Sequence, residues 1–174
     1  YERSGLWYIC SGSLMNNTNL DGKPYFLTAF HCYDGSDVNS YIFYFDYESP
    51  DCNNPTSTPS SNTLSGATFK SAWSGSDFAL VQINDYPPIN YNVFYAGFDA
   101  TDTTPSSTIG IHHPKGDIKK ISIDNQGPTQ SSVTIGSQTS AVWNTRFDSG
   151  TTEGGSSGSP LFSNNYRVIA QLYG

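Results

Sequence analysis

The segment TEGGSSGSPLF, residues 152–162, contains only glycine and serine from position 154 to position 159 and then runs directly into Pro160, Leu161 and Phe162. Such a composition is typical of a flexible linker, because Gly/Ser-rich chains behave as random coils. It is also typical of a tight turn that presents one serine hydroxyl among backbone N–H groups, because glycine adopts backbone conformations that other residues avoid. The rest of the chain decides between these two interpretations.

Length and composition limit the classes of protein to consider. The chain has 174 residues, which suits one domain or two small barrels packed as a unit. Its 12 Tyr, 10 Phe and 3 Trp supply enough large side chains for a sizeable core, so we expect an ordered chain. The net charge is −7 with only 8 Lys and Arg, and no run of about 18 apolar residues is present. We therefore expect no nucleic-acid partner and no membrane partner.

The hydrophobic pattern predicts strands rather than helices. Short apolar or alternating runs, rich in aromatic and β-branched residues, are separated by Gly, Pro, Asn, Asp and Ser. Residues 84–106 contain prolines and turn residues and are predicted to connect two sets of strands, while residues 49–65 are predicted to form a polar loop. Many short strands with frequent turns indicate an all-β sandwich or barrel. The expected strands are 6–15, 24–29, 41–46, 67–72, 78–83, 107–112, 118–123, 132–136, 140–147, 159–162 and 166–172.

Three polar positions are candidates for chemistry. His31 ends the apolar run FLTAF, Asp77 directly precedes the apolar run FALVQI, and the serines of GGSSGS follow much later. Taken singly, a histidine at a strand end, an aspartate in a turn and a Gly/Ser loop all have structural explanations. Taken together, they supply what a serine nucleophile needs: a base for the hydroxyl proton, a carboxylate that orients this base, and N–H donors for an oxyanion.

The sequence resembles the chymotrypsin-like serine endopeptidases, most closely the bacterial lysyl endopeptidases. This resemblance implies two packed antiparallel β-barrels of the six-stranded type, incomplete at both termini of the chain. Residues 1–88 would form the barrel with His31 and Asp77, and residues 89–174 the barrel with Ser157, together making one peptidase domain. The matching segments occur in collinear order and are CSGSLMNN (10–17), YFLTAFHC (25–32), SDFALVQIN (76–84), IGIHHPKGDIKKIS (109–122), TEGGSSGSPLF (152–162) and RVIAQLYG (167–174).

The resemblance also implies roles for individual residues. His31 would be the general base, Asp77 the acid that orients it, and Ser157 the nucleophile. The backbone N–H groups of Gly155 and Ser157 would form the oxyanion hole. Ser156 stands where vertebrate trypsin-like enzymes carry an aspartate that pairs with a newly freed N-terminus, so we do not expect that mode of activation.

The function implied by the resemblance is that of a secreted serine endopeptidase, which acts on protein or peptide substrates through an acyl-enzyme and needs no cofactor. The lysyl branch cleaves after lysine, and Gln171, Tyr173 and Gly174 would lie beside the substrate backbone. That branch has a histidine near position 173 and a pocket carboxylate beyond position 174, so a glutamyl-type endopeptidase stays open as an alternative. A catalytically inactive binding or adhesin module of the trypsin fold is the other alternative.

The cysteines and histidines bear on disulfides and metals. No CxxC pair is present, which disfavours zinc. His112 and His113 are adjacent on an expected strand and would point to opposite faces, so we expect no metal site. The resemblance implies a disulfide between Cys10 and Cys32, which would close about 22 residues and stabilise the fold by roughly 3 kcal/mol. It matches Cys52 to a cysteine whose partner lies upstream of residue 1; a buried unpaired thiol is the alternative.

Overall fold

The computed structural model describes residues 1–55, 57, 59 and 61–173. Within that part the chain is all-β, as predicted, with one four-residue α-helix and short 3-10 helices. In chain order the strands are β1 (Glu2–Arg3), β2 (Leu6–Trp7), β3 (Ser13–Met15), β4 (Tyr25–Ala29), β5 (Ile42–Phe45), β6 (Asn62–Ser65), β7 (Ala67–Trp73), β8 (Phe78–Ile83), β9 (Thr108–His112), β10 (Lys120–Asp124), β11 (Thr129–Ile135), β12 (Gln138–Asn144), β13 (Pro160–Ser163) and β14 (Val168–Gln171). The helices are α1 (Phe30–Tyr33), η1 (Val38–Ser40), η2 (Ser74–Ser76), η3 (Ile89–Tyr91) and η4 (Pro114–Gly116).

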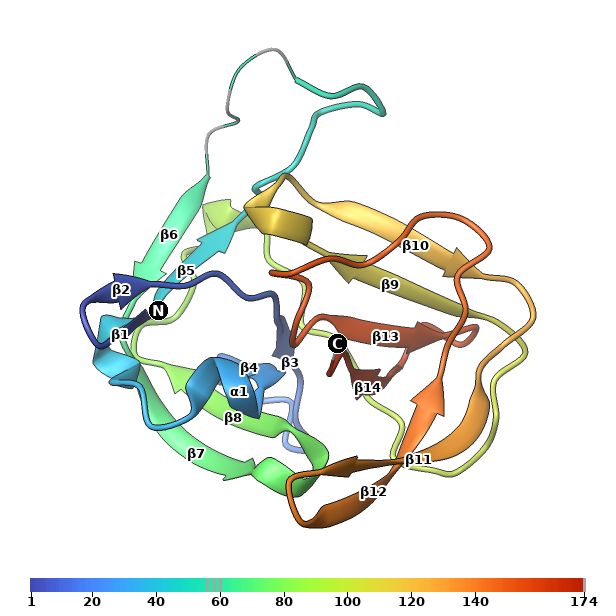
Figure 1. Ribbon diagram of the computed structural model, residues 1–174. Helices are drawn as coiled ribbons and strands as arrows, with labels where there is room; N and C mark the ends of the chain where they lie inside the picture. The colour runs from blue at the N-terminus through green and yellow to red at the C-terminus, as the bar shows by residue number, and fades with distance from the viewer. Residues whose placement is uncertain (56, 58, 60, 174) are drawn as a thin grey trace.

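The N-terminal half is built on a four-stranded antiparallel sheet of order β3-β4-β8-β7 (Figure 1). Strand β8 shows why these residues form a sheet: in FALVQI the side chains of Ala79, Val81 and Ile83 are 0% exposed and alternate with partly exposed neighbours. This period of two buries one face of the strand. A core of Leu14, Tyr41, Phe43, Ala67, Val81 and Ile83 lies against this face.

The C-terminal half repeats this plan with a four-stranded sheet of order β10-β9-β13-β14 and a separate hairpin, β11-β12 (Figure 1). Residues of the predicted connector join the two halves, because Ala96 bridges to Met15 and Phe98 bridges to Val168. A second core, made of Met15, Leu27, Ala96 and Val168, contains residues from both halves. The two sheets are therefore packed together through a shared apolar cluster.

The expected barrels differ from the structure in one respect. Among the described residues the N-terminal half consists of a four-stranded sheet and the two-stranded sheets β1-β2 and β5-β6, the C-terminal half of a four-stranded sheet and the hairpin β11-β12, and the ladders do not close into a barrel. In the N-terminal half the reason lies at Gly66, whose φ of +76° turns the chain between β6 and β7 and separates their ladders. Phe43 of β5 still packs in the same core as Val81 of β8, so the enclosure is completed by side chains.

Most strand boundaries lie within three residues of the predicted ones, and two segments differ more. The expected strand 6–15 is interrupted between β2 and β3, where Cys10 forms a disulfide and the backbone N–H of Ser11 donates to the carbonyl of Ser157 instead of a neighbouring strand. The expected loop 49–65 ends earlier, since residues 62–65 form β6 and pair with β5. No helix in the described part of the chain is long and apolar enough to cross a membrane.

Candidate active site

His31 and Asp77, which are 46 residues apart in sequence, form a close pair. Asp77 Oδ2 lies 2.8 Å from His31 Nδ1, and Asp77 Oδ1 accepts a hydrogen bond of 2.8 Å from the backbone N–H of His31. The aspartate side chain is 3% exposed, whereas the histidine side chain is 43% exposed. The carboxylate therefore fixes the inner edge of the imidazole and leaves Nε2 on the accessible side.

The ladder between β4 and β8 brings this pair together. Ala29 pairs with Phe78 at the end of the ladder, and one step further the N–H of Phe30 donates to the carbonyl of Asp77 (2.7 Å). Asp77 has a left-handed backbone (φ 53°), a conformation that aspartate tolerates better than most residues. From β14, the amide nitrogen of Gln171 donates to the carbonyl of Asp77 (2.9 Å), so the C-terminal half supports this turn.

The loop with Ser157 lies against the end of β4. Gly155 and Gly158 have φ values of +93° and +82°, which only glycine adopts without strain. A Cβ atom on Gly158 would lie 2.6 Å from the backbone nitrogen of Ala29 and 2.6 Å from the carbonyl oxygen of Ser11. The tight turn, not the flexible linker, is thus the correct interpretation of this segment, and it places Ser157 beside the strand that leads into His31.

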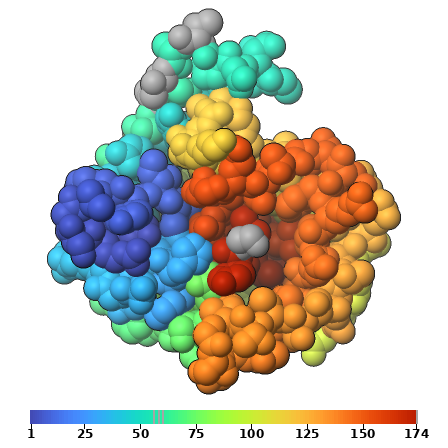
Figure 2. Space-filling view, in the orientation of Figure 1, coloured from blue at the N-terminus to red at the C-terminus, as the bar shows by residue number. Residues whose placement is uncertain are grey.

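The Ser157 hydroxyl has no hydrogen bond to His31 or to any other group in the described part of the chain. Hydrogen bonds between a nucleophile and its base are often long in unliganded sites and tighten when substrate binds. In Figure 2 the surface is hollowed where the red C-terminal segment lies, with light-blue atoms of the N-terminal half on one side and orange atoms of the C-terminal half on the other.

Backbone geometry in the loop leaves the N–H groups of Gly154, Gly155 and Ser157 without acceptors among the described residues. The carbonyl of Gly154 accepts from the N–H of Lys115 (2.6 Å), and the carbonyl of Gly155 accepts from the Ser11 hydroxyl (2.8 Å). Both carbonyls are therefore bonded to other parts of the chain. Within the residues that the structure describes, the N–H groups of Gly155 and Ser157 have no hydrogen-bond acceptor. Two such donors are what an oxyanion needs.

Ser11 connects the loop to its surroundings, and the sequence analysis did not identify it. Its backbone N–H donates to the carbonyl of Ser157 (2.9 Å), and its carbonyl accepts from the hydroxyl of Thr28 (2.8 Å). Its own hydroxyl donates to Gly155 and accepts from the N–H of His113 (3.0 Å). The only sequence signal is its position next to the bridged Cys10, because all these partners are distant in the chain.

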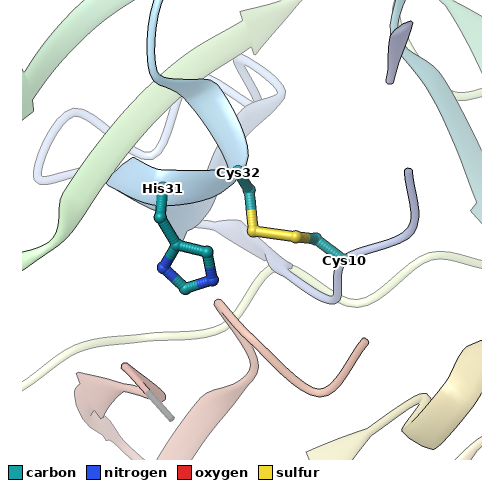
Figure 3. Close-up of side chains that lie close together, drawn as sticks. All are labelled: Cys10, His31 and Cys32. Atoms are coloured by element: carbon teal, nitrogen blue, oxygen red, sulfur yellow. A yellow bond between two sulfur atoms is a disulfide. The ribbon is translucent and has the colours of Figure 1, made fainter. Parts of the chain in front are cut away.

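The disulfide predicted between Cys10 and Cys32 is present, with a Cα–Cα distance of 6.4 Å. Figure 3 shows it beside the His31 ring on α1. Ligand atoms of Cys10, His31 and Cys32 lie within 4.8 Å of one another. Because the two sulfurs bond to each other, neither offers the thiolate that a metal ion needs. Cys52 is exposed, not buried as the alternative required, and has no disulfide partner among the described residues.

Removing this disulfide is expected to destabilise the fold. The Cys10→Ser/Cys32→Ser variant should lose about 3 kcal/mol of unfolding free energy, because the bridge restricts a loop of 22 residues in the unfolded chain. Urea denaturation followed by tryptophan fluorescence measures the loss. Cys52→Ser is the matched control and should unfold at the wild-type urea concentration. Equal midpoints for the double variant and the wild type would show that the bridge does not stabilise the fold.

The three residues expected to contact substrate have different positions. Gln171 directs its amide nitrogen to the carbonyls of Asp77 and Ser76 (2.9 and 3.4 Å), so this group supports the aspartate turn. Tyr173 is 44% exposed, and its ring lies edge-on to His31 with centroids 6.2 Å apart. Gly174 lies outside the described residues.

His112 is the last residue of β9, and His113 follows it directly. The two side chains face different environments, as expected from the alternation of side chains along a strand. His112 is 1% exposed and contacts two serine hydroxyls, Ser156 and Ser122, whereas Nδ1 of His113 contacts the carbonyl of Asp117 (3.0 Å). Burial lowers the pKa of both rings, and the two histidines lie beside each other, which lowers the pKa of His112 further.

Stability is accordingly expected to fall in acid. In the unfolded chain His112 and His113 take up protons near the ordinary pKa of 6.5, whereas the folded chain resists this. Their contribution to stability is complete above pH 6.5 or so and is lost as the pH falls through the lowered folded pKa values. Urea midpoints measured from about pH 7.5 to about pH 5 should decrease, and less so in a His112→Gln variant. Identical slopes in the variant and the wild type would contradict this assignment.

Comparison with known sequences gives one family. Residues 1–174 match the family described as lysyl endopeptidase, C-terminal domain. The chain is 33% identical over 177 residues to a lysyl endopeptidase of Pseudomonas aeruginosa, and the alignment covers 96% of this chain and 37% of that relative. The chain therefore spans little more than a third of the length of this curated relative.

Comparison with solved structures supports the fold. The inactive form of Rv3671c from M. tuberculosis H37Rv, a serine-to-alanine mutant, has a TM-score of 0.63 at 18% identity and covers 95% of this chain and 69% of its own. A thermostable serine protease, AL20, from an extremophilic microorganism has a TM-score of 0.56 at 16% identity, covering 94% and 76%. At such identities the likeness bears on the fold alone, and it confirms the expected chymotrypsin-like, all-β class.

Proposed function

Because this chain belongs to the lysyl endopeptidase C-terminal domain family, we propose that it is a serine endopeptidase whose catalytic triad is His31, Asp77 and Ser157. The observation that carries the proposal is the 2.8 Å contact between Asp77 Oδ2 and His31 Nδ1, made by a buried carboxylate and a ring that is still 43% exposed. A base held at one nitrogen and accessible at the other is the arrangement that serine activation needs.

The proposed reaction uses groups already described. Ser157 Oγ attacks the substrate carbonyl carbon while His31 Nε2 takes the hydroxyl proton. The oxygen that becomes negative accepts hydrogen bonds from the N–H groups of Gly155 and Ser157. His31 then gives its proton to the leaving amine, which departs and leaves an acyl-enzyme. Water attacks this ester with His31 again as base, and Ser157 recovers its proton as the acid product leaves. Asp77 stays ionised throughout.

Strand β14 offers an edge for the substrate backbone. It is the terminal strand of the β10-β9-β13-β14 sheet, and beyond the bridge from Phe98 to Val168 no strand pairs with its outer side within the described part of the chain. An extended peptide binds to such an edge through main-chain hydrogen bonds. Tyr173 follows this strand and lies beside His31, so a peptide along β14 passes the proposed base.

The proposed specificity is cleavage after lysine. The Pseudomonas relative, 33% identical to this chain, is named a lysyl endopeptidase. The net charge of −7 also favours a cationic substrate over an acidic one. A glutamyl-type site would require cationic groups near the cleft, and the chain has only 8 Lys and Arg in total.

The chain is proposed to act as one peptidase unit outside the cell. Residues 1–88 contribute His31 and Asp77 and residues 89–174 contribute Ser157, and the shared core around Met15 and Ala96 supports their working together. The disulfide between Cys10 and Cys32 supports an oxidising compartment, because such bonds are rare in the reducing cytosol.

Digestion of a denatured test protein examines both activity and specificity. Mass spectrometry of the products should show new peptides that end in lysine. Peptides that end in glutamate would support the peptidase proposal but show that the enzyme cleaves after glutamate instead of lysine. A folded chain that produces no new peptides would contradict the peptidase proposal and favour a binding module.

A further inference from the structure

A buried network of hydrogen bonds links the loop of residues 154–159, which contains the proposed nucleophile, to the C-terminal sheet. His112 Nδ1 lies 2.8 Å from the hydroxyl of Ser156, and His112 Nε2 lies 3.0 Å from the hydroxyl of Ser122. The three residues are 0–1% exposed. Both ring nitrogens thus have partners in a region that water does not reach, and Ser156 is the residue immediately before the proposed nucleophile.

The directions of the hydrogen bonds define the protonation state of the ring. The Ser122 hydroxyl donates to the carbonyl of Thr151 (3.2 Å), so it accepts from an Nε2–H group of His112. The Ser156 hydroxyl accepts from the N–H of Glu153 (3.2 Å) and has its own hydrogen left for Nδ1. A neutral His112 with its proton on Nε2 satisfies every donor. A charged ring would place a second hydrogen on Nδ1 and leave the Ser156 hydrogen without an acceptor.

These hydrogen bonds fix the part of the loop on which the proposed oxyanion hole depends. Ser156 shares one peptide group with Gly155 and the next with Ser157, so a fixed Ser156 restrains the orientation of both. The N–H of Ser156 is also bonded to the carbonyl of Glu153 (2.9 Å). On the opposite side the loop is held by the Ser11 hydroxyl. The two N–H donors therefore lie between two sets of fixed contacts.

We propose that neutral His112 is a positioning residue that holds the oxyanion loop of this peptidase through Ser156, and that its protonation releases the loop and lowers turnover. The proposal deepens the proposed function and rests on it. Vertebrate trypsin-like enzymes have an aspartate in an ion pair at the position of Ser156. In this chain a serine bonded to a neutral imidazole takes its place. This supplies a second acid-sensitive group, separate from the His31 base.

Charged groups on the neighbouring strand do not compensate a charge on His112. Lys120 is the register partner of His112 on β10, and its ammonium lies 3.5 Å from the carboxylate of Asp117. Asp124, further along β10 on the same face, contacts the hydroxyl of Thr108 (3.2 Å). Strand β13, on the other side of β9, has the sequence PLFS and no charge.

The loops around the ring are equally unable to stabilise the charged form. The carboxylate of Glu153 is 2.7 Å from Lys115 Nζ, and His113 adds positive charge when it is protonated. Burial first, and then His113, lower the pKa of His112. Among the described residues no carboxylate contacts its ring. Because no buried ion pair can form, protonation of His112 in acid breaks the hydrogen bond between its ring and the Ser156 hydroxyl.

Kinetics of two variants test the proposal. His112→Leu, which cannot bond to Ser156, should lower kcat by about 10–100-fold with little change in KM, since a small displacement of catalytic donors costs this much. His112→Gln retains hydrogen bonding without titration and should recover part of the loss. In the wild type the logarithm of kcat should fall more steeply in acid than in His112→Gln, where the side chain of residue 112 cannot take up a proton. His113→Gln is the control: it should keep the kcat of the wild type at neutral pH, and its acid limb should move only to higher pH, because the charge that helps to lower the pKa of His112 is gone.

A measurement independent of turnover keeps the proposal testable if a variant does not fold. The chain has 3 histidines, so nitrogen-15 NMR of the labelled wild type resolves each ring. His112 should show the Nε2–H neutral form and resist protonation as the pH is lowered. Wild-type kcat and acid slope in both variants, or a charged or Nδ1–H ring, would overturn the proposal. A folded wild type without any turnover that depends on Ser157 would instead refute the proposed function.

Discussion

Replacing Ser157 with alanine is expected to reduce turnover of a peptide substrate by about 10⁶-fold. The variant has no hydroxyl to attack the carbonyl, and only the N–H groups of Gly155 and residue 157 remain to stabilise the oxyanion. Residual catalysis of about 10³–10⁴-fold over water should persist for that reason. Because the hydroxyl has no hydrogen-bond partner among the described residues, its loss should leave the urea midpoint unchanged.

Ser132→Ala is the control for this substitution. Ser132 is exposed on β11, and its variant should have wild-type kcat and KM. Steady-state kinetics with a chromogenic lysine ester, together with thermal unfolding, separates loss of chemistry from loss of fold. If Ser157→Ala kept wild-type turnover while folding normally, another residue would have to be the nucleophile.

Replacing Asp77 with asparagine is expected to lower kcat by about 10⁴-fold. Asp77 accepts two hydrogen bonds, one from the backbone N–H of His31 and one at His31 Nδ1. In the variant the amide oxygen can keep the backbone bond, which leaves the NH₂ group facing Nδ1. The imidazole must then accept at Nδ1 and carry its proton on Nε2, where it cannot take the proton of Ser157.

Asp102→Asn is the matched control, because Asp102 is exposed and lies outside the site. It should show wild-type kinetics. The Asp77 variant should bind substrate with nearly unchanged KM, since the substitution alters the base and not the proposed edge at β14. Wild-type kcat in Asp77→Asn would mean that the contact with His31 is structural and that the triad assignment is wrong.

The sequence was most informative where a local pattern has one physical solution. Alternation in FALVQI predicts a half-buried strand, and β8 is buried at every second residue. The glycines around Ser157 predict a turn with unusual backbone angles, and Gly155 and Gly158 have positive φ. The contact between His31 and Asp77 could be predicted only from the family resemblance. The physical reason for it is the β4–β8 ladder, which composition does not reveal.

Sequence reasoning failed where the partners are far apart in the chain. Ser11 and Gly155 are 144 positions apart, and Gln171 and Asp77 are 94 apart, so no local pattern links them. In the sequence, His112 stands out only as one of two adjacent histidines. Its position on the buried face of β9 follows from strand alternation, but its bond to Ser156 depends on how β9 and the loop pack together. Serine hydroxyls in such bonds have no compositional signature.

The most direct test of the triad is the site of reaction with a fluorophosphonate probe, which phosphonylates an activated serine. We expect stoichiometric labelling of the folded wild type, with the adduct mapped by peptide mass spectrometry to Ser157 alone and blocked by prior unfolding. An adduct on Ser156 or another serine, or a folded chain that takes up no probe, would contradict the triad assignment.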